Sequence, residues 1–178
     1  MLAFALILTV GISAGLSAPA ENSSNLPKPD ISEPTSTVKQ EMISPINSPE
    51  VIKWYSDTEL FYNSTLKQWE SHRGVDLTSN QGTDVVAVLD GTVLDCSYSY
   101  EDGYCVKIDH SNGLVTTYCS LKEGCNVNIG DSVKQGQKIG EISSSASNES
   151  AVGDHLHFSI TLNNAYVDPA NYLTFENK

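Results

Sequence analysis

The chain has little positive charge. Its 178 residues include 10 Lys and Arg against 22 Asp and Glu, which gives a formal net charge of −12, and the basic residues form no cluster. Proteins that bind nucleic acid or anionic lipid headgroups use basic patches to neutralise phosphate charge. The sequence therefore argues against nucleic acid and anionic lipid headgroups as partners. Its acidity indicates nothing more specific.

Positive charge is missing from the N-terminus as well. Residues 2–18 form an uncharged, apolar run, although Lys or Arg normally marks the cytoplasmic side of a membrane segment. The run has roughly the minimum length for a transmembrane helix. A cleaved secretory signal ending at the Ala-Pro-Ala of residues 18–20 is the alternative. We favour the interpretation that residues 1–20 are an uncleaved, single-pass anchor in the cell membrane. Either interpretation places the rest of the chain outside the cytoplasm.

Aromatic residues are absent from residues 21–50, which are rich in Ser, Pro, Asn and Glu. Such a segment cannot bury enough apolar surface to offset its ordering entropy, and its prolines interrupt any coiled coil. We predict a disordered tether over residues 21–50, followed by one compact domain over residues 51–178.

Sustained helical periodicity is also lacking. Alternating, β-branched segments, separated by Gly-containing turns, occur instead at residues 83–89, 91–97, 104–110 and 114–118. Short strands at regular spacing predict an all-β domain. Asn112-Gly113 is typical of a hairpin turn because both residues tolerate positive φ. Residues 54–69 are mixed, and we expect strands around a loop there.

Cysteine is sparse and has no Cys-x-x-Cys spacing, which argues against a cysteine metal site. Outside the cytoplasm, Cys96, Cys105, Cys119 and Cys125 can form disulfides in three connectivities. If the strands pair around the expected turns, Cys105 lies near Cys96 on one side and near Cys119 on the other, and it can bond only one of them. Unpaired, buried core cysteines are the alternative.

Only four histidines are present, and three of them fall in two motifs, HRGVD at residues 72–76 and GDHLHF at residues 153–158. Zinc is bound by imidazole and carboxylate, and a catalytic zinc site keeps three protein ligands and one open position. Strand alternation places His155 and His157 on one face. The motifs can thus supply three ligands and leave one histidine for acid/base work; a polar strand face with ordinary histidines is the alternative. We interpret the fourth, His110, as structural or exposed.

These segments resemble the zinc peptidase family of lysostaphin and LytM, enzymes that cut peptide cross-links in bacterial cell wall. The resemblance covers roughly residues 69–172 and includes HRGVDL, VVAVLDGTV, GYCVKIDHSNGLVTTY, GDSVKQGQKIG and GDHLHFSI. It implies an antiparallel, duplicated hybrid motif-like β-sheet domain and a zinc cofactor. It also implies His72, Asp76 and His157 as zinc ligands and His155 as one of two catalytic histidines.

Residues 130–140, GDSVKQGQKIG, form a compact hairpin in this family, and a similar segment occurs in biotinyl and lipoyl carrier domains. Those carriers present a lysine at a hairpin tip, typically flanked by methionines. The only methionines here are Met1 and Met42, which favours the peptidase family over the carriers.

One position departs from the family pattern. The enzymes carry Tyr-x-His where this chain has Tyr118-Cys-Ser120, so Ser120 replaces the second catalytic histidine. A hydroxyl cannot carry positive charge near neutral pH, whereas an imidazole can, although the hydroxyl can still donate a hydrogen bond. The same replacement is a feature of a membrane-anchored branch of the family that binds a partner across the forespore septum.

The resemblance therefore implies a membrane-anchored, zinc-binding module that binds cell wall or a septal protein in sporulation, with weak or absent peptidase activity. Its expected partners are peptidoglycan peptides or a facing extracytoplasmic membrane protein. An active zinc metalloendopeptidase that hydrolyses peptidoglycan cross-links is the alternative. We expect docking surfaces at exposed sheet edges near the start of the domain or at residues 166–175, because an unpaired edge can add a partner's strand.

Overall fold

The computed structural model describes residues 41–79 and 83–175, and these residues belong to one compact unit. The anchor expected at residues 1–20 and most of the tether expected at residues 21–50 lie outside the described part and stay predictions. Within the described ranges, no helix is both long and apolar enough to cross a membrane.

The described residues form twelve β-strands and two short 3-10 helices, which confirms the all-β prediction. The strands are β1 (Glu50–Lys53), β2 (Ser56–Asn63), β3 (Gln68–His72), β4 (Val75–Thr78), β5 (Asp84–Val86), β6 (Gly91–Ser99), β7 (Gly103–Asp109), β8 (Leu114–Leu121), β9 (Ser132–Val133), β10 (Lys138–Glu141), β11 (Leu156–Leu162) and β12 (Ala165–Val167). The helices are η1 (Ser147–Glu149) and η2 (Pro169–Asn171).

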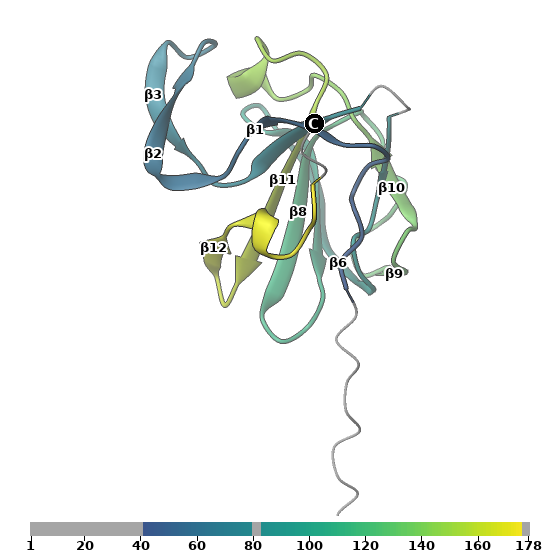
Figure 1. The fold of residues 1–178 in the computed structure, drawn as a ribbon. Helices are drawn as coiled ribbons and strands as arrows, with labels where there is room; N and C mark the ends of the chain where they lie inside the picture. Colours follow the sequence, from purple (N-terminus) through teal and green to yellow (C-terminus); the bar gives the residue numbers. More distant parts are fainter. Residues whose placement is uncertain (1–40, 80–82, 176–178) are drawn as a thin grey trace, which may run out of the picture. The chain divides into compact units, whose positions relative to one another are not determined.

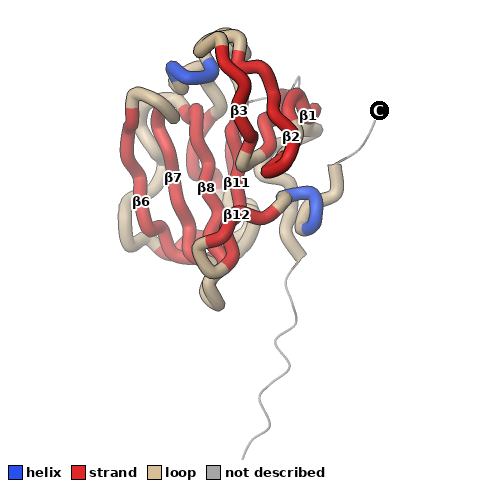
Figure 2. The backbone as a smooth tube through the Cα atoms, turned by 90° about the vertical axis from the view of Figure 1, so that its left-hand side faces the viewer, coloured by secondary structure: helices blue, strands red, loops and turns tan. Residues whose placement is uncertain are grey.

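Eight strands form one antiparallel sheet in the order β1-β4-β11-β8-β7-β6-β9, with β12 paired to β11. Figure 2 shows β6, β7, β8 and β11 side by side. The central strand β11 pairs with β8 along its length, with β4 through its first half and with β12 through its second half. Strands β2 and β3 form a separate hairpin that projects beside the sheet (Figure 1), as expected for residues 54–69. Strands β5 and β10 form a second two-stranded sheet.

The turn between β7 and β8 follows from its sequence. Ser111, Asn112 and Gly113 all have positive φ, which glycine adopts freely and asparagine tolerates better than most residues. The expected hairpin at Asn112-Gly113 therefore forms.

The hairpin expected at residues 130–140 is wrong in its pairing. The turn itself is present, because the Gln137 N–H donates to the Lys134 carbonyl at 2.9 Å. However, β9 pairs with β6 and β10 pairs with β5. The chain at Ala87 lies between the two arms: its N–H donates to the Gln137 carbonyl, and its carbonyl accepts from the Gly136 N–H, each at 2.9 Å. The arms thus belong to different sheets.

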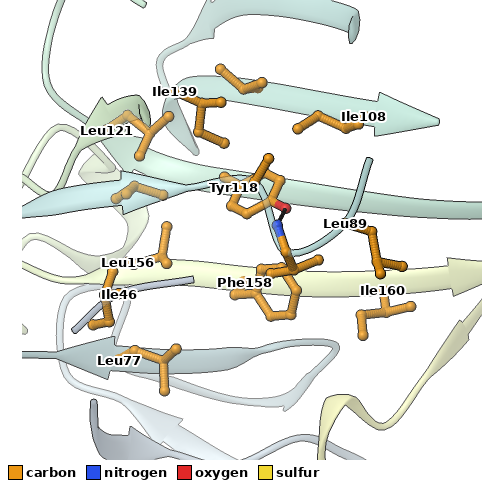
Figure 3. Close-up of a cluster of buried hydrophobic side chains, with 14 of the residues drawn as sticks. Ile46, Leu77, Leu89, Ile108, Tyr118, Leu121, Ile139, Leu156, Phe158 and Ile160 are labelled. Carbon is orange, nitrogen blue, oxygen red and sulfur yellow. Dashed lines mark hydrogen bonds between the residues drawn. The ribbon is translucent and has the colours of Figure 1, made fainter. Parts of the chain in front are cut away.

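The core contains buried side chains from the large sheet and from the segments around β5 and β10, and Figure 3 shows a part of it. Tyr118 of β8 and Phe158 of β11 are fully buried at its centre, with ring centroids 5.2 Å apart. The Tyr118 hydroxyl accepts a hydrogen bond from the Val88 N–H at 3.0 Å. Burial raises the pKa of Tyr118 to about 12, so the phenol stays neutral and satisfies a backbone donor within the core.

His110 has a structural role. Its Nδ1 lies 2.8 Å from the Asp90 carbonyl, and its Nε2 lies 2.8 Å from the Thr116 hydroxyl. The Thr116 hydroxyl lies 3.1 Å from the Tyr118 hydroxyl. Burial lowers the pKa of His110. The neutral ring therefore donates at Nδ1 and accepts at Nε2, and it connects a loop to the core.

The folded domain begins before residue 51, so the tether boundary predicted at residue 50 is wrong. Ile46 is only 2% exposed, and it forms a β-bridge with Val85. The Pro45 carbonyl accepts from the Val86 N–H at 2.8 Å, and the Ile43 N–H donates to the Val88 carbonyl at 3.2 Å. Apolar side chains scattered among the prolines attach this stretch to the core, although its overall composition is polar.

All four cysteines are paired. Cys105 of β7 is bonded to Cys119 of β8, with Cα atoms 4.2 Å apart, and Cys96 of β6 is bonded to Cys125. Of the two neighbours open to Cys105, the structure therefore selects Cys119. The two bridges join β7 to β8 and β6 to the segment after β8.

Candidate metal centre

Four neighbouring strands of the large sheet, β1, β4, β11 and β8, align the polar residues of the site. In the sheet register, Lys53 of β1 lies opposite Asp76 of β4, Asp76 lies opposite His157 of β11, and His157 lies opposite Cys119 of β8. Cross-strand partners share a face of the sheet. The two distant motifs therefore meet because β4 and β11 are neighbours.

His72, at the end of β3, completes a three-residue cluster. Its Nε2 lies 3.1 Å from Asp76 Oδ1 and 3.2 Å from His157 Nδ1, and His157 Nδ1 lies 2.8 Å from Asp76 Oδ1. The other ring nitrogen of His72, Nδ1, donates to the Trp54 carbonyl at 2.9 Å. A backbone acceptor of this kind fixes the tautomer and leaves Nε2 free to bind a metal.

Gly74, in the middle of the HRGVD motif, leaves space for a ligand ring. A Cβ at this position would lie 2.7 Å from the Phe158 carbonyl and 2.8 Å from the His157 imidazole. Such separations are too short for real Cβ contacts, so any side chain here would displace His157.

The donor set fits zinc. Two donors that are each about 2.0–2.1 Å from a tetrahedral zinc lie about 3.3 Å apart, close to the separations of 2.8–3.2 Å found here. Asp76 is fully buried. Among the described residues, its Oδ2 is the one buried side-chain oxygen or nitrogen without a hydrogen-bond partner, and the nearest cation, Lys53 Nζ, is 3.9 Å away. A buried oxygen left in this way is costly unless it gains a partner such as a metal.

Asp76 is ionised. Burial alone would raise the pKa of its carboxyl group. The hydrogen bonds and positive charge of His157 and His72 outweigh burial and hold that pKa well below its usual range. The site therefore presents a buried negative charge beside two imidazoles, the form of the ligand that binds a divalent cation.

His155 lies next to the cluster but outside it. It is fully buried; its Nδ1 donates to the Gly153 carbonyl at 2.8 Å, and its Nε2 lies 3.3 Å from Glu149 Oε2. Burial lowers the pKa of His155, but the hydrogen bonds to Glu149 and Gly153 outweigh it and raise that pKa. The same carboxylate oxygen lies 3.7 Å from His157 Nδ1. The sequence motifs do not contain Glu149, and its position in a connection six residues before His155 gave no signal.

Ser120 is turned toward the connection between β10 and β11. It is fully buried and has a positive φ of 59°. Its hydroxyl donates to the Ser143 carbonyl at 2.8 Å, and its own carbonyl accepts from the Ser143 N–H at 2.9 Å. The single hydroxyl proton is therefore used within the fold.

Comparison with known proteins assigns the chain to a class. The model of Peptidase family M23 matches residues 70–169, more than half of the chain, and the chain belongs to this family. Family M23 is zinc-dependent, in agreement with the group of possible metal ligands formed by His72, Asp76, Glu149 and His157. Membership excludes the biotinyl and lipoyl carrier domains as an interpretation of residues 130–140.

Two curated relatives show the range of the family. The chain is 37% identical over 114 residues to stage II sporulation protein Q of Bacillus subtilis, a match that covers 63% of this chain and 38% of that protein. It is 36% identical over 102 residues to the peptidoglycan DD-endopeptidase ShyC of Vibrio cholerae, which covers 57% of this chain and 23% of the enzyme. The matches thus span less than two fifths of either relative.

Solved structures confirm the lysostaphin/LytM fold. The SpoIIQ-SpoIIIAH pore forming complex matches with a TM-score of 0.65 and 29% identity, over 75% of this chain and 90% of the matched chain. The catalytic domain of lysostaphin from Staphylococcus simulans matches with a TM-score of 0.56 and 28% identity, over 69% and 90% respectively.

Proposed function

We propose that this chain is an extracytoplasmic, zinc-binding member of family M23 that acts as a binding module in sporulation. In this proposal its face contacts peptidoglycan peptides or a facing extracytoplasmic membrane protein, and its peptidase activity is weak or absent. The similarity to stage II sporulation protein Q and to its complex with SpoIIIAH supports the sporulation role.

The hydrogen bond from Ser120 to the Ser143 carbonyl carries the proposal. The family resemblance expects an imidazole at this position, where it would stabilise negative charge that develops on the substrate. A hydroxyl whose proton is already donated within the fold cannot take that role. Loss of one such group commonly costs a factor of about 100 or more in rate.

The metal ligands serve either function. Zinc bound by His72, Asp76 and His157 would acidify a bound water and polarise a scissile carbonyl. His155 would have to accept a proton to act as a general base. Its hydrogen bonds to Gly153 and Glu149 instead favour the protonated ring, which can donate but not accept.

The alternative function, an active zinc endopeptidase on peptidoglycan cross-links, is favoured by one observation. The three ligands converge with separations suited to zinc, and His155 stands beside them. The similarity to the endopeptidase ShyC is consistent with this second candidate.

Location and partner contact are also proposals. An uncleaved helix at residues 2–18 would anchor the chain in the cell membrane, with the domain outside the cytoplasm, and secretion is the alternative. The paired cysteines suit an oxidising compartment. Strand β1, near the start of the domain, forms one edge of the large sheet. Tyr166 of β12, in the segment 166–175, is exposed. We propose both segments as docking surfaces for a strand of a partner. Fractionation with N-terminal sequencing tests the anchor; a mature chain that starts near residue 21 and is free in the medium would contradict it.

The deciding experiment separates binding from hydrolysis. The full 178-residue chain is incubated with purified peptidoglycan in the presence of zinc or a chelator, and both the sedimented protein and the released soluble peptides are measured. We expect zinc-dependent sedimentation without peptide release, and we expect His72→Ala to weaken the sedimentation. Robust zinc-dependent release by the unmutated chain would instead establish the endopeptidase. If the chain neither sediments nor releases peptides, peptidoglycan is not its partner.

A further inference from the structure

Glu149 places a carboxylate at the metal centre. It ends η1, in the connection between β10 and β11, and its side chain is 14% exposed. Four possible ligand atoms lie within 4.8 Å of one another, one each from His72, Asp76, Glu149 and His157. A tetrahedral zinc site needs separations of about 3.3 Å, so the carboxylate has to move by at most about 1.5 Å, within the reach of a side-chain rotation.

The carboxylate is held in this position from two sides. Lys53 Nζ of β1 lies 3.1 Å from Glu149 Oε1, and His155 Nε2 lies 3.3 Å from Glu149 Oε2. Two hydrogen-bonding partners therefore hold the carboxylate beside the other possible ligands.

The backbone around η1 is fixed to the rest of the domain. The side-chain amide of Asn63, in the β2–β3 hairpin, donates to the Asn148 carbonyl at 2.9 Å, and the Ala151 N–H donates to the Thr65 hydroxyl at 3.0 Å. Figure 1 shows this connection beside the β2–β3 hairpin. Because two hydrogen bonds tie the hairpin and the connection together, Glu149 is positioned by the fold rather than by chance at a loop tip.

Glu149 also lines two grooves. One groove is lined by His72, His157 and Cys119, and the other is lined by Lys53 and Asp76; Glu149 lines both. A peptide that passes along the metal centre from one groove to the other would meet this side chain.

We propose that Glu149 is the fourth protein ligand of the metal and completes a closed set with His72, Asp76 and His157. Structural zinc sites have four protein ligands, whereas catalytic sites have three and leave a position for water. A carboxylate in the fourth position therefore excludes the water that hydrolysis needs. This inference rests on the zinc binding proposed above and gives a second, independent reason for weak hydrolysis.

Cobalt in place of zinc tests the proposal, because the visible spectrum of Co²⁺ reports its ligands and geometry. The full chain, loaded with Co²⁺, is titrated with azide, a small anion that binds an open metal position. We expect the spectrum of the unmutated chain to stay unchanged. We expect azide to alter the spectrum of Glu149→Ala, in which water takes the fourth position, and zinc affinity to fall at least about tenfold in this variant.

Two further variants complete the experiment. Glu149→Gln keeps the size of the side chain and removes its charge, so it should show weakened zinc binding even if Glu149→Ala folds poorly. Glu141→Ala is the matched control, since its carboxylate pairs with Lys138 and Lys122 instead, and it should behave like the unmutated chain. If azide alters the unmutated spectrum as it alters Glu149→Ala, and zinc affinity is equal, Glu149 is no ligand while the proposed zinc-binding function stands. If the unmutated chain binds neither metal, both proposals fail.

Discussion

Replacement of Asp76 by asparagine should remove most of the stability that zinc gives to the domain. Asp76 is fully buried. Its Oδ1 lies within hydrogen-bonding distance of His72 Nε2 and His157 Nδ1, whereas its Oδ2 has no hydrogen-bond partner. Asparagine keeps the shape but removes the charge, and one of its terminal atoms becomes an amide nitrogen that cannot bind a cation. We expect zinc affinity to fall by at least about 100-fold.

The size of the effect follows from mass action. At a free zinc concentration about 100 times the dissociation constant of the unmutated chain, zinc raises the free energy of unfolding by about 2.7 kcal/mol. At the same concentration, a variant with 100-fold weaker binding gains only about 0.4 kcal/mol. The difference of about 2.3 kcal/mol corresponds to about 5–9 °C in melting temperature for a chain of this length.

Thermal unfolding with zinc and with a chelator measures the two shifts. Asp84→Asn is the matched control, because Asp84 makes an exposed ion pair with Lys138 and such pairs contribute little to stability. It should show the full zinc shift. An equal zinc shift in Asp76→Asn and in the unmutated chain would refute Asp76 as a ligand, and a zinc shift of zero in the unmutated chain would refute the metal centre.

Three further predictions follow from the same site. Gly74→Ala should weaken zinc binding and destabilise the domain by about 1–3 kcal/mol, measured by zinc titration and denaturant unfolding, because its Cβ would meet a carbonyl and an imidazole of β11 at 2.7–2.8 Å; unchanged affinity would contradict the close approach. The metal-free chain should be most stable between about pH 4 and pH 6.5. The lowered pKa of Asp76 contributes stability that is lost as pH falls below about 4. The raised pKa of His155 contributes stability that is lost as pH rises above about 6.5. If the chain in chelator is most stable above pH 8, these two groups do not govern the pH dependence of its stability. In peptide-release assays, Ser120→His combined with Glu149→Ala should exceed Glu149→Ala alone by about 100-fold, since histidine tolerates positive φ; equal rates would show that Ser120 does not limit hydrolysis.

The strands, and the convergence of the three residues expected to bind zinc, could be predicted because their signals are local. Alternation and the Asn112-Gly113 turn specify β7 and β8, and the motifs around His72 and His157 identify residue types that zinc prefers. Asp76 and His157 then meet because the strands that carry them pair in register. For this part of the site, the local pattern and the tertiary structure agree.

Lys53 and Glu149 could not be predicted, because their roles depend on contacts between distant segments. Lys53 is 96 positions from Glu149 in the chain, and nothing in the sequence around either residue indicates that they meet. The same reason explains the missed start of the domain at Ile46, whose β-bridge to Val85 is a tertiary contact. A polar average composition concealed the apolar side chains that attach this segment.

In the binding module proposed above, a metal that does not catalyse would still have a function. His72 belongs to the β2–β3 hairpin, Asp76 and His157 belong to the large sheet, and Glu149 belongs to the connection between β10 and β11. A single ion bound by these four would join three elements of the fold, and the free energy of binding to the folded site would add to the free energy of folding. The hairpin and the connection also line the grooves beside the centre. Zinc would therefore order the surface that the proposed module offers to a partner, which would account for a set of possible ligands in a chain that lacks the second catalytic imidazole.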